Sequence, residues 1–199
     1  MTGSTARSEA LPAPSFVMTR GNQMTLEELA DRIEIQQLVC KYSRAIDRRD
    51  YGLLKSLYAE GSIDEHGGMF SGSGAEFVEW VSKVLEGSGH TSHQILNHLI
   101  ELAGDYAEGE VYTCNVHIME DSDGKKVNIS TGSRYLDKYV RSINGWQFLH
   151  RKTVADYTLN LPVPTDALAL KIRHGAPVAG VGQHDPSCGF FRLIGAAGQ

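Results

Sequence analysis

The hydrophobic pattern divides the chain into a helical first part and a β-rich second part. From residue 25 onward, apolar side chains recur at intervals of three and four residues, which is the stripe of an amphipathic helix. The stripe consists of Ile35, Leu38, Val39, Tyr42 and Ile46. The T-x-x-E spacing at its start is typical of a capping box. The sequence therefore predicts a helix of about 21 residues that ends near Asp47.

Two shorter helices are predicted after the first. One covers about residues 51–58, and Gly61 ends it. The other covers about residues 75–85 and has its own apolar row. A short strand over 62–65 is expected between these two helices, ending at a pair of glycines.

The remainder of the apolar sequence has the character of strands. Four segments are predicted, at about 91–102, 107–119, 126–141 and 145–158, with turn residues between them. The Asn-Gly pair at 144–145, between two long apolar-rich runs, is a strong hairpin signal. Helices followed by a meander of strands indicate an α+β fold, with the helices packed on one face of an antiparallel sheet.

The two ends of the chain differ in composition from this middle part. Residues 1–23 are rich in Ser, Thr, Ala, Pro and Gly and are predicted to be a disordered leader. Residues 24–160 are predicted to form one domain. Residues 161–199 carry four of the six prolines and no clear periodicity. They are expected to form an extended tail that packs on the domain or on a neighbouring subunit.

Composition narrows the class of function. Asp and Glu number 24 against 19 Lys and Arg, which argues against a nucleic-acid partner because that requires a basic face. No apolar run approaches the roughly 20 residues that span a bilayer, so no membrane association is expected. The first 23 residues contain no apolar segment of a secretory signal. Three widely spaced cysteines suggest no disulfide framework. A reduced, cytoplasmic protein is expected.

Neither a metal nor a nucleotide cofactor is expected. The sequence contains no H-E-x-x-H pattern and no cluster of cysteines. His90 and His93 are three residues apart, and a strand would direct them to opposite faces. No G-x-G-x-x-G or phosphate-loop pattern is present.

Several motifs between about residues 25 and 160 carry a resemblance to a known family. They include Tyr42-Ser43-Arg44-Ala45-Ile46-Asp47, Thr91-Ser92-His93, Ser133-Arg134-Tyr135 and Gly145-Trp146-Gln147-Phe148. With the order of elements, they resemble the SnoaL-like branch of the nuclear transport factor 2-like superfamily. This branch includes polyketide cyclases, scytalone dehydratase, bile acid 7α-dehydratase and lindane dehydrochlorinase. The resemblance implies a cone-shaped barrel of four to six antiparallel strands, with three N-terminal helices closing a pocket.

The resemblance also implies a catalytic group. In the dehydratase and dehydrochlorinase members, an Asp at the end of the first helix pairs with a His on the first long strand, and Asp47 and His93 match these positions. Asp47 would fix the tautomer of His93 and stabilise its imidazolium, while His93 would remove a proton next to a carbonyl or a leaving group. Tyr42 matches a third position and would donate its phenol proton to an oxyanion or a departing hydroxyl.

Each of these residues also has a structural interpretation. Tyr42 lies in the apolar stripe, and Asp47 lies in a charged helix end. His93 alone, on a half-apolar strand, would more often be a satisfied structural residue.

Strand alternation suggests further residues of the pocket. If His93 faces the pocket, Asn97 lies on the same wall. On the next strand the resemblance to the family assigns the mixed row, Thr113, Asn115 and His117, to the pocket. The more apolar row that contains Tyr112 is assigned to a subunit contact or to outer packing. Two further residues, outside these rows, are candidate substrate contacts. The candidates for substrate binding are Asn97, Thr113, Asn115, His117, Tyr58 and Arg134.

Two arginines near the end of the domain are also open to a structural role. Arg134 is expected either to hold an acidic group or to pair with Asp137. Arg151 and Asp156 are expected to form an ion pair or a surface contact.

Several functions remain open at this point. The leading hypothesis is a cofactor-independent lyase, a dehydratase or related elimination enzyme, that acts on an apolar ring-containing small molecule such as a steroid, polyketide or aromatic. Carbon–carbon cleavage of a lignin-type aromatic, or an isomerase or cyclase, would use the same base. The alternatives without catalysis are a small subunit of a ring-hydroxylating dioxygenase and a binding module. A homo-oligomer is expected, a trimer rather than a dimer.

Overall fold

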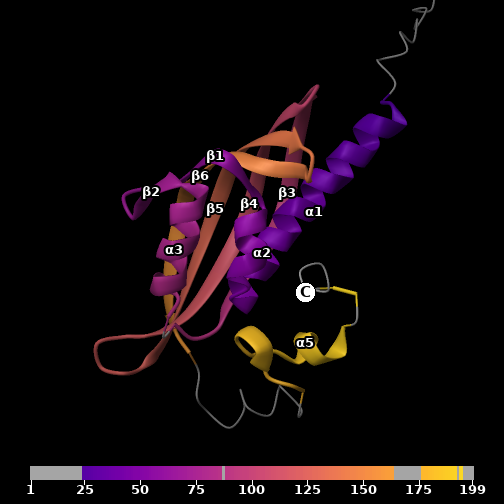
Figure 1. Ribbon diagram of the computed structural model, residues 1–199. Helices are drawn as coiled ribbons and strands as arrows, with labels where there is room; N and C mark the ends of the chain where they lie inside the picture. Colours follow the sequence, from indigo (N-terminus) through magenta and orange to yellow (C-terminus); the bar gives the residue numbers. More distant parts are fainter. Residues whose placement is uncertain (1–23, 87, 164–175, 192, 195–199) are drawn as a thin grey trace, which may run out of the picture.

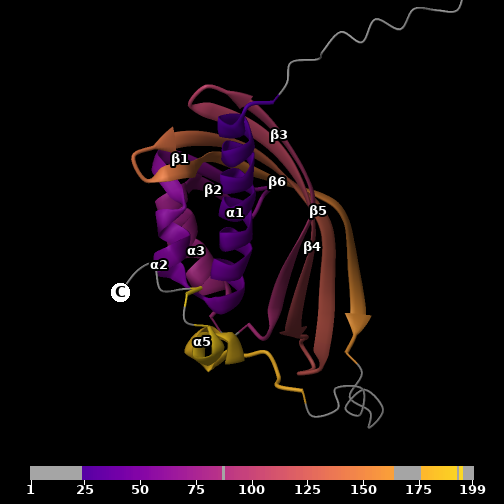
Figure 2. The ribbon, with the colours of Figure 1, turned by 90° about the vertical axis from the view of Figure 1, so that its right-hand side faces the viewer.

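The computed structural model describes residues 24–86, 88–163, 176–191 and 193–194. The chain has an α+β fold in which a curved six-stranded sheet carries helices on its concave side (Figure 1, Figure 2). The strands follow the order β2-β1-β6-β5-β4-β3 across the sheet. The predicted leader, residues 1–23, lies outside the described residues.

The three predicted helices are present and begin at the residues that cap them. Helix α1 covers Leu26–Arg48, and Thr25 and Glu28 form the predicted capping box. Helix α2 is Tyr51–Ser56, and α3 is Gly74–Val84, with a second capping box made by the residue before it. Helix α2 is shorter than predicted because the backbone of Leu57 already accepts a hydrogen bond from the sheet, from the N–H of Phe148 at 2.8 Å.

The four long strands agree with prediction to within a few residues. They are β3 (Thr91–Ala103), β4 (Tyr106–Glu120), β5 (Lys126–Ser142) and β6 (Gly145–Pro162), each paired antiparallel with the next. The short predicted strand is longer, β1 (Tyr58–His66), and it forms a hairpin with a strand that was not predicted, β2 (Phe70–Ser73).

Two features of the predicted sheet are wrong. The sheet is mixed, because β1 pairs in parallel with β6. It is also open rather than a closed barrel, with β2 and β3 as its two edges. Helices α1 and α3 cover the concave face between those edges (Figure 2), so packing against helices replaces strand pairing as the means of enclosing the core.

The centre of the core contains a buried ion pair surrounded by aromatic rings. Arg151 is fully buried, and its guanidinium donates to the Asp137 carboxylate at 2.7 and 2.6 Å.

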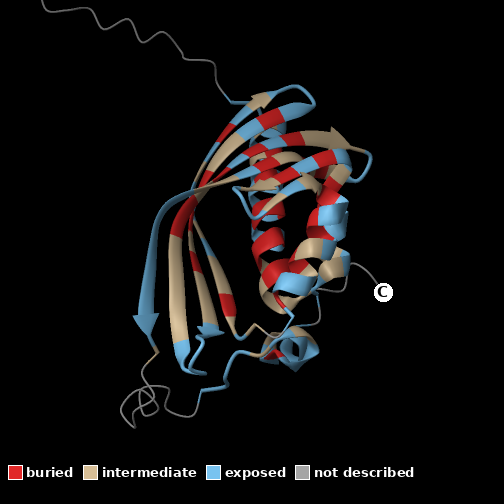
Figure 3. Cartoon of the chain, turned by 90° about the vertical axis from the view of Figure 1, so that its left-hand side faces the viewer, coloured by how far each residue is buried: buried red, intermediate tan, exposed pale blue. Residues whose placement is uncertain are grey.

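The partners predicted for Arg134 and Arg151 were wrong. Arg134 pairs with Asp156 and Glu110 on the outer face of the sheet, because strand alternation puts Arg134 and Asp137 on opposite faces of β5. Figure 3 shows the buried positions gathered between sheet and helices.

The described part of the predicted tail contains a short helix. Helix α5, Pro186–Phe190, lies beside the C-terminal end of α1 (Figure 2). Asp185, which caps it, also pairs with Arg48 of α1 at 3.1 Å. Among the described residues, no helix combines the length and the apolar character that crossing a membrane requires.

Candidate functional site

Asp47 and His93 form a tightly bonded pair. Asp47 belongs to the last turn of α1, and His93 lies near the start of β3. The Nδ1 atom of His93 is 2.7 Å from Oδ1 of Asp47, and the backbone N–H of His93 donates to Oδ2 at 2.9 Å. Burial alone would raise the pKa of Asp47, but the bonds from His93 lower it below its usual value. The carboxylate is therefore ionised and accepts Nδ1–H, which leaves Nε2 as the free nitrogen of the ring.

Arg49 holds the two elements of this pair together. It ends α1 in the left-handed conformation, with a φ of 56°. Its guanidinium donates to the carbonyl of Ile46 and to the hydroxyl of Thr91, both at 2.8 Å, and to the carbonyl of Gly89 at 3.1 Å. These bonds tie the end of the helix to the start of β3. Sequence reasoning missed this role, and the only signal was a basic residue directly after the helix end.

A cavity of about 380 Å³ lies between the helices and the concave face of the sheet. Its wall is mostly apolar, with a few polar groups, as is usual for sites that bind small organic molecules. His93 lines it together with residues of α1, α3 and the strands. The wall is formed by Tyr42, Ile46, His66, Met69, Phe77, Trp80, Val81, Val84, Leu85, Ser88, His93, Asn115, His117, Met119, Ile129, Thr131, Ser133, Tyr135, Thr153 and Ala155.

His117 is the neighbour of His93 in this wall. The two imidazole rings meet edge to face, with their centroids 5.3 Å apart. Burial, and then the nearby charge of His93, lower the pKa of His117 to about 4. His117 is therefore neutral near pH 7 and can donate or accept one hydrogen bond without carrying a charge.

The structure brings together four of the predicted site residues with His93 at the cavity: Tyr42, Asn115 and His117 line it, and Asp47 reaches it through His93. Two others are not in the wall. Thr113 is buried behind it, with its hydroxyl 2.7 Å from that of Ser133. Tyr58 is also buried, and its hydroxyl donates to Asp64.

The predicted position of Asn97 is wrong. The pairing of β3 with β4 shifts between Ile95 and His98, so β3 carries a bulge there. A bulge inserts one residue and reverses which face the following side chains occupy. Asn97 is therefore exposed, and His98 turns inward, with its Nε2 3.1 Å from the hydroxyl of Tyr139.

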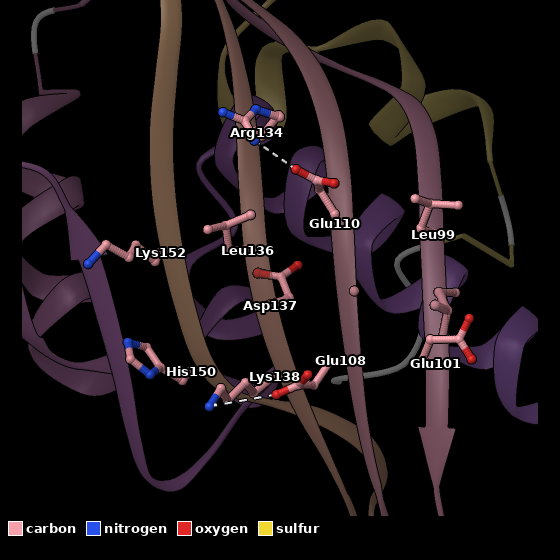
Figure 4. Close-up of a pocket in the computed structure, with 12 residues that line it drawn as sticks. Leu99, Glu101, Glu108, Glu110, Arg134, Leu136, Asp137, Lys138, His150 and Lys152 are labelled. Carbon is pink, nitrogen blue, oxygen red and sulfur yellow. Dashed lines mark hydrogen bonds and ion pairs between the residues drawn. The ribbon is translucent and has the colours of Figure 1, made fainter.

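The predicted position of Arg134 is also wrong. It lines a second, open hollow of about 650 Å³ on the opposite face of the sheet, shown in Figure 4. There Arg134 donates to Glu110 at 2.8 Å, and Lys138 lies 3.7 Å from Glu108. Tyr112 is exposed on this outer side, which confirms the predicted faces of β4.

Sequence reasoning missed several polar residues of the cavity. Ser133 accepts a hydrogen bond from the Asn115 amide at 3.0 Å, and Thr153 lies on β6 opposite Tyr135. Oδ1 of Asn115 and Oγ1 of Thr153 have no hydrogen-bond partner within the described residues. The alternation rule applied to β5 could have identified Ser133, but on β6 a register shift between Phe148 and His150 reverses the faces before Thr153. His66, on β1, was missed because only a short strand was predicted there.

Comparisons with known proteins agree with this architecture. The sequence model of a family described as "SnoaL-like domain" matches residues 27–152. The uncharacterized protein Rv2910c of Mycobacterium tuberculosis is 30% identical over 132 residues, which are 65% of this chain and 88% of that protein.

Solved structures show the same fold at lower identity. A hexachlorocyclohexane dehydrochlorinase, LinA type 2, is 21% identical with a TM-score of 0.64, over 71% of this chain and 96% of that one. The protein called "Putative Scytalone Dehydratase" from Novosphingobium aromaticivorans is 21% identical with a TM-score of 0.59, over 71% and 94%. At these identities the structural likeness concerns the fold alone.

Proposed function

Because the chain belongs to the family of SnoaL-like domain proteins, we propose that it is a cofactor-independent lyase that acts on an apolar ring-containing small molecule. The observation that carries the proposal is the Asp47–His93 pair, whose imidazole lies in the wall of a mostly apolar cavity. Nε2 of His93 has no hydrogen-bond partner among the described residues, and the imidazole lines the cavity in which a molecule would bind.

In this proposal each member of the pair has its own role. Asp47 holds Nδ1–H, so the Nε2 lone pair of His93 removes a proton from a carbon next to a carbonyl. The electrons of that C–H bond form a double bond as the neighbouring C–O bond breaks. The imidazolium that results is stabilised by the Asp47 carboxylate and returns its proton to the departing hydroxyl, which leaves as water.

Tyr42 fits the role of a hydrogen-bond donor in this reaction. Burial raises the pKa of Tyr42 well above its usual value, so the phenol keeps its proton. A protonated phenol in the cavity wall can donate to the oxygen on which negative charge develops. The names of the structural neighbours, a dehydrochlorinase and a scytalone dehydratase, describe eliminations of this type.

An isomerase or cyclase is the second candidate. It would begin with the same removal of a proton by His93 and would differ only in the step that follows. Exchange of the proton at the carbon next to the carbonyl, without loss of a leaving group, would favour it. The two non-catalytic alternatives need no base, whereas the described pair is formed and faces a cavity.

The test uses 3-hydroxy-1-tetralone, a cyclic ketone that loses water to give fluorescent 1-naphthol. The wild-type protein is expected to accelerate this reaction, and His93→Gln to lower kcat by about 10²–10⁴-fold, the usual contribution of a positioned base. His150→Asn is the matched control, because His150 also lies near a carboxylate, Glu65 at 3.4 Å, but on the outer face. A His93→Gln variant as active as the wild type would contradict the proposed base.

We also propose that the protein is a homo-oligomer, a trimer rather than a dimer. The outer face of the sheet exposes apolar side chains that an interface would cover, among them Leu96, Leu99 and Tyr112. Light scattering coupled to size-exclusion chromatography measures the mass directly. A mass equal to that of one 21.8 kDa chain would contradict the proposal.

A further inference from the structure

The cavity contains a second carboxylate–imidazole pair, on strand β1. The Nδ1 atom of His66 lies 2.6 Å from Oδ1 of Asp64. The hydroxyl of Tyr58 donates to the other carboxylate oxygen of Asp64 at 2.5 Å. Asp64 has no exposed surface, whereas His66 lines the cavity. The mechanism proposed above makes no use of this group.

The two pairs lie on opposite sides of the concave face of the sheet, which forms the floor of the cavity. His93 is on β3 and His66 is on β1, and β4, β5 and β6 lie between them in the sheet. Each of those strands also contributes side chains to the wall. Four steps of about 4.8 Å between neighbouring strands add up to about 19 Å across the curved sheet, before any offset along the strands is counted. A molecule that contacts both histidines must therefore extend across the floor.

The surroundings of His66 determine which of its atoms a bound molecule can reach. Its ring stacks on Phe77, with centroids 4.8 Å apart and an angle of 11°, and Trp80 lies 6.1 Å away. These contacts fix the plane of the ring. Asp64 accepts hydrogen bonds from Tyr58 and from Nδ1–H of His66, so Nε2 is the remaining nitrogen and is an acceptor in the neutral ring.

A purely structural role for Asp64 and His66 would not explain why a polar pair occurs in an otherwise apolar part of the wall. The residues around His66 in the cavity are Met69, Phe77 and Trp80, which are apolar. Replacing a buried polar pair with well-packed apolar residues is often neutral or stabilising, so stability alone does not call for Asp64 and His66 here. An acceptor fixed in an apolar wall is the arrangement that binding sites use to orient a ligand.

We propose that Nε2 of His66 accepts a hydrogen bond from a hydroxyl group at the far end of the ring compound whose reacting carbon lies at His93. This inference rests on the proposed function for the position of the reacting end. It defines the substrate class as an elongated ring compound with two oxygen functions, a carbonyl near His93 and a hydroxyl remote from it. His66 is thus a binding residue, and Asp64 and Tyr58 position it.

The experiment measures equilibrium binding and requires no turnover. Two matched pairs of probes differ only in the remote hydroxyl: 6-hydroxy-1-tetralone with 1-tetralone, and dihydrotestosterone with its 17-deoxy analogue. Isothermal titration or equilibrium dialysis gives the Kd of each. For at least one pair, the hydroxyl is expected to tighten binding by about tenfold, the value of one net hydrogen bond.

Two substitutions at His66 separate its two nitrogens. His66→Asn retains an amide that can donate to Asp64 in place of Nδ1 but removes the acceptor at Nε2, so the gain from the hydroxyl is expected to disappear. His66→Gln offers an amide oxygen near the position of Nε2 and is expected to keep part of the gain. His150→Asn, on the outer face, should keep all of it.

The outcomes distinguish this inference from the proposed function. Equal Kd values within both pairs of probes, including no measurable binding of any probe, would overturn the role of His66. A gain that survives in His66→Asn would overturn it as well. His93→Gln is expected to lower kcat for dehydration by about 10²–10⁴-fold while the gain in affinity remains. If the catalytic proposal alone fails, the wild type will show the gain in affinity without any dehydration.

Discussion

The buried pair of Asp137 and Arg151 should tolerate the loss of both members better than the loss of Asp137 alone. Arg151 has no exposed surface, and the centre of its guanidinium lies 4.1 Å from the rings of Tyr42 and Phe148. Tyr135 closes a third side at 4.2 Å. Asp137 is the carboxylate that neutralises this charge, through two hydrogen bonds.

The magnitude follows from what Asp137→Asn leaves behind. Burial alone would lower the pKa of Arg151, but Asp137 raises it well above its usual value, and an arginine in any case keeps its proton at ordinary pH. The variant therefore buries an uncompensated charge, which typically costs about 3–5 kcal/mol of the free energy of unfolding. The cation–π contacts with the three rings, each up to about 2 kcal/mol when desolvated, are present in both proteins and therefore do not change this difference.

Urea unfolding of four proteins measures the effect. They are the wild type, Asp137→Asn, Arg151→Met and the double variant. Asp137→Asn is expected to lose about 3–5 kcal/mol, and the double variant is expected to be more stable than Asp137→Asn because the unpaired charge is gone. A loss below about 1 kcal/mol in Asp137→Asn, or a double variant whose loss equals the sum of the two single losses, would refute the reasoning.

Three further predictions concern the site and its support. Asp47→Asn should lower kcat for dehydration by about 10²–10⁴-fold, because the tautomer of His93 is no longer fixed, and steady-state kinetics would detect it. The pKa of His117 is about 4 in the folded chain, against 6.5 for an ordinary histidine. Between these two pH values, His117 binds a proton in the unfolded chain but not in the folded chain. The free energy of unfolding should therefore fall as pH falls through this window, and His117→Asn should remove that contribution in pH-dependent urea titrations. Gly74→Ala should destabilise the fold by about 1–3 kcal/mol, since its Cβ would lie 2.5 Å from the ring of Tyr58, whereas Gly68→Ala meets nothing within 4 Å and serves as the control in thermal unfolding.

Sequence patterns within single segments were sufficient to predict most of the fold. The capping box at Thr25, the helical stripe and the four long strands depend on neighbouring residues, and the structure contains them nearly as predicted. The parallel pairing of β1 with β6 joins segments about 90 residues apart, and its choice depends on how the helices cover the sheet. Strand β2 has four residues, too few for a two-residue period to stand out.

The candidate site shows where alternation stops being a guide. Counting in twos from His93 reaches Asn97, and in the structure this is correct only as far as Ile95, where the bulge begins. A bulge depends on a change of pairing with the partner strand, so the residues of β3 alone do not reveal it. From Ser62 to His66 of β1, beyond the irregularity that follows Tyr58, the rule holds, and Asp64 and His66, two residues apart, share the inner face and bond to each other. The second pair was therefore accessible to the rule that misplaced Asn97, and what concealed it was the underestimated length of β1.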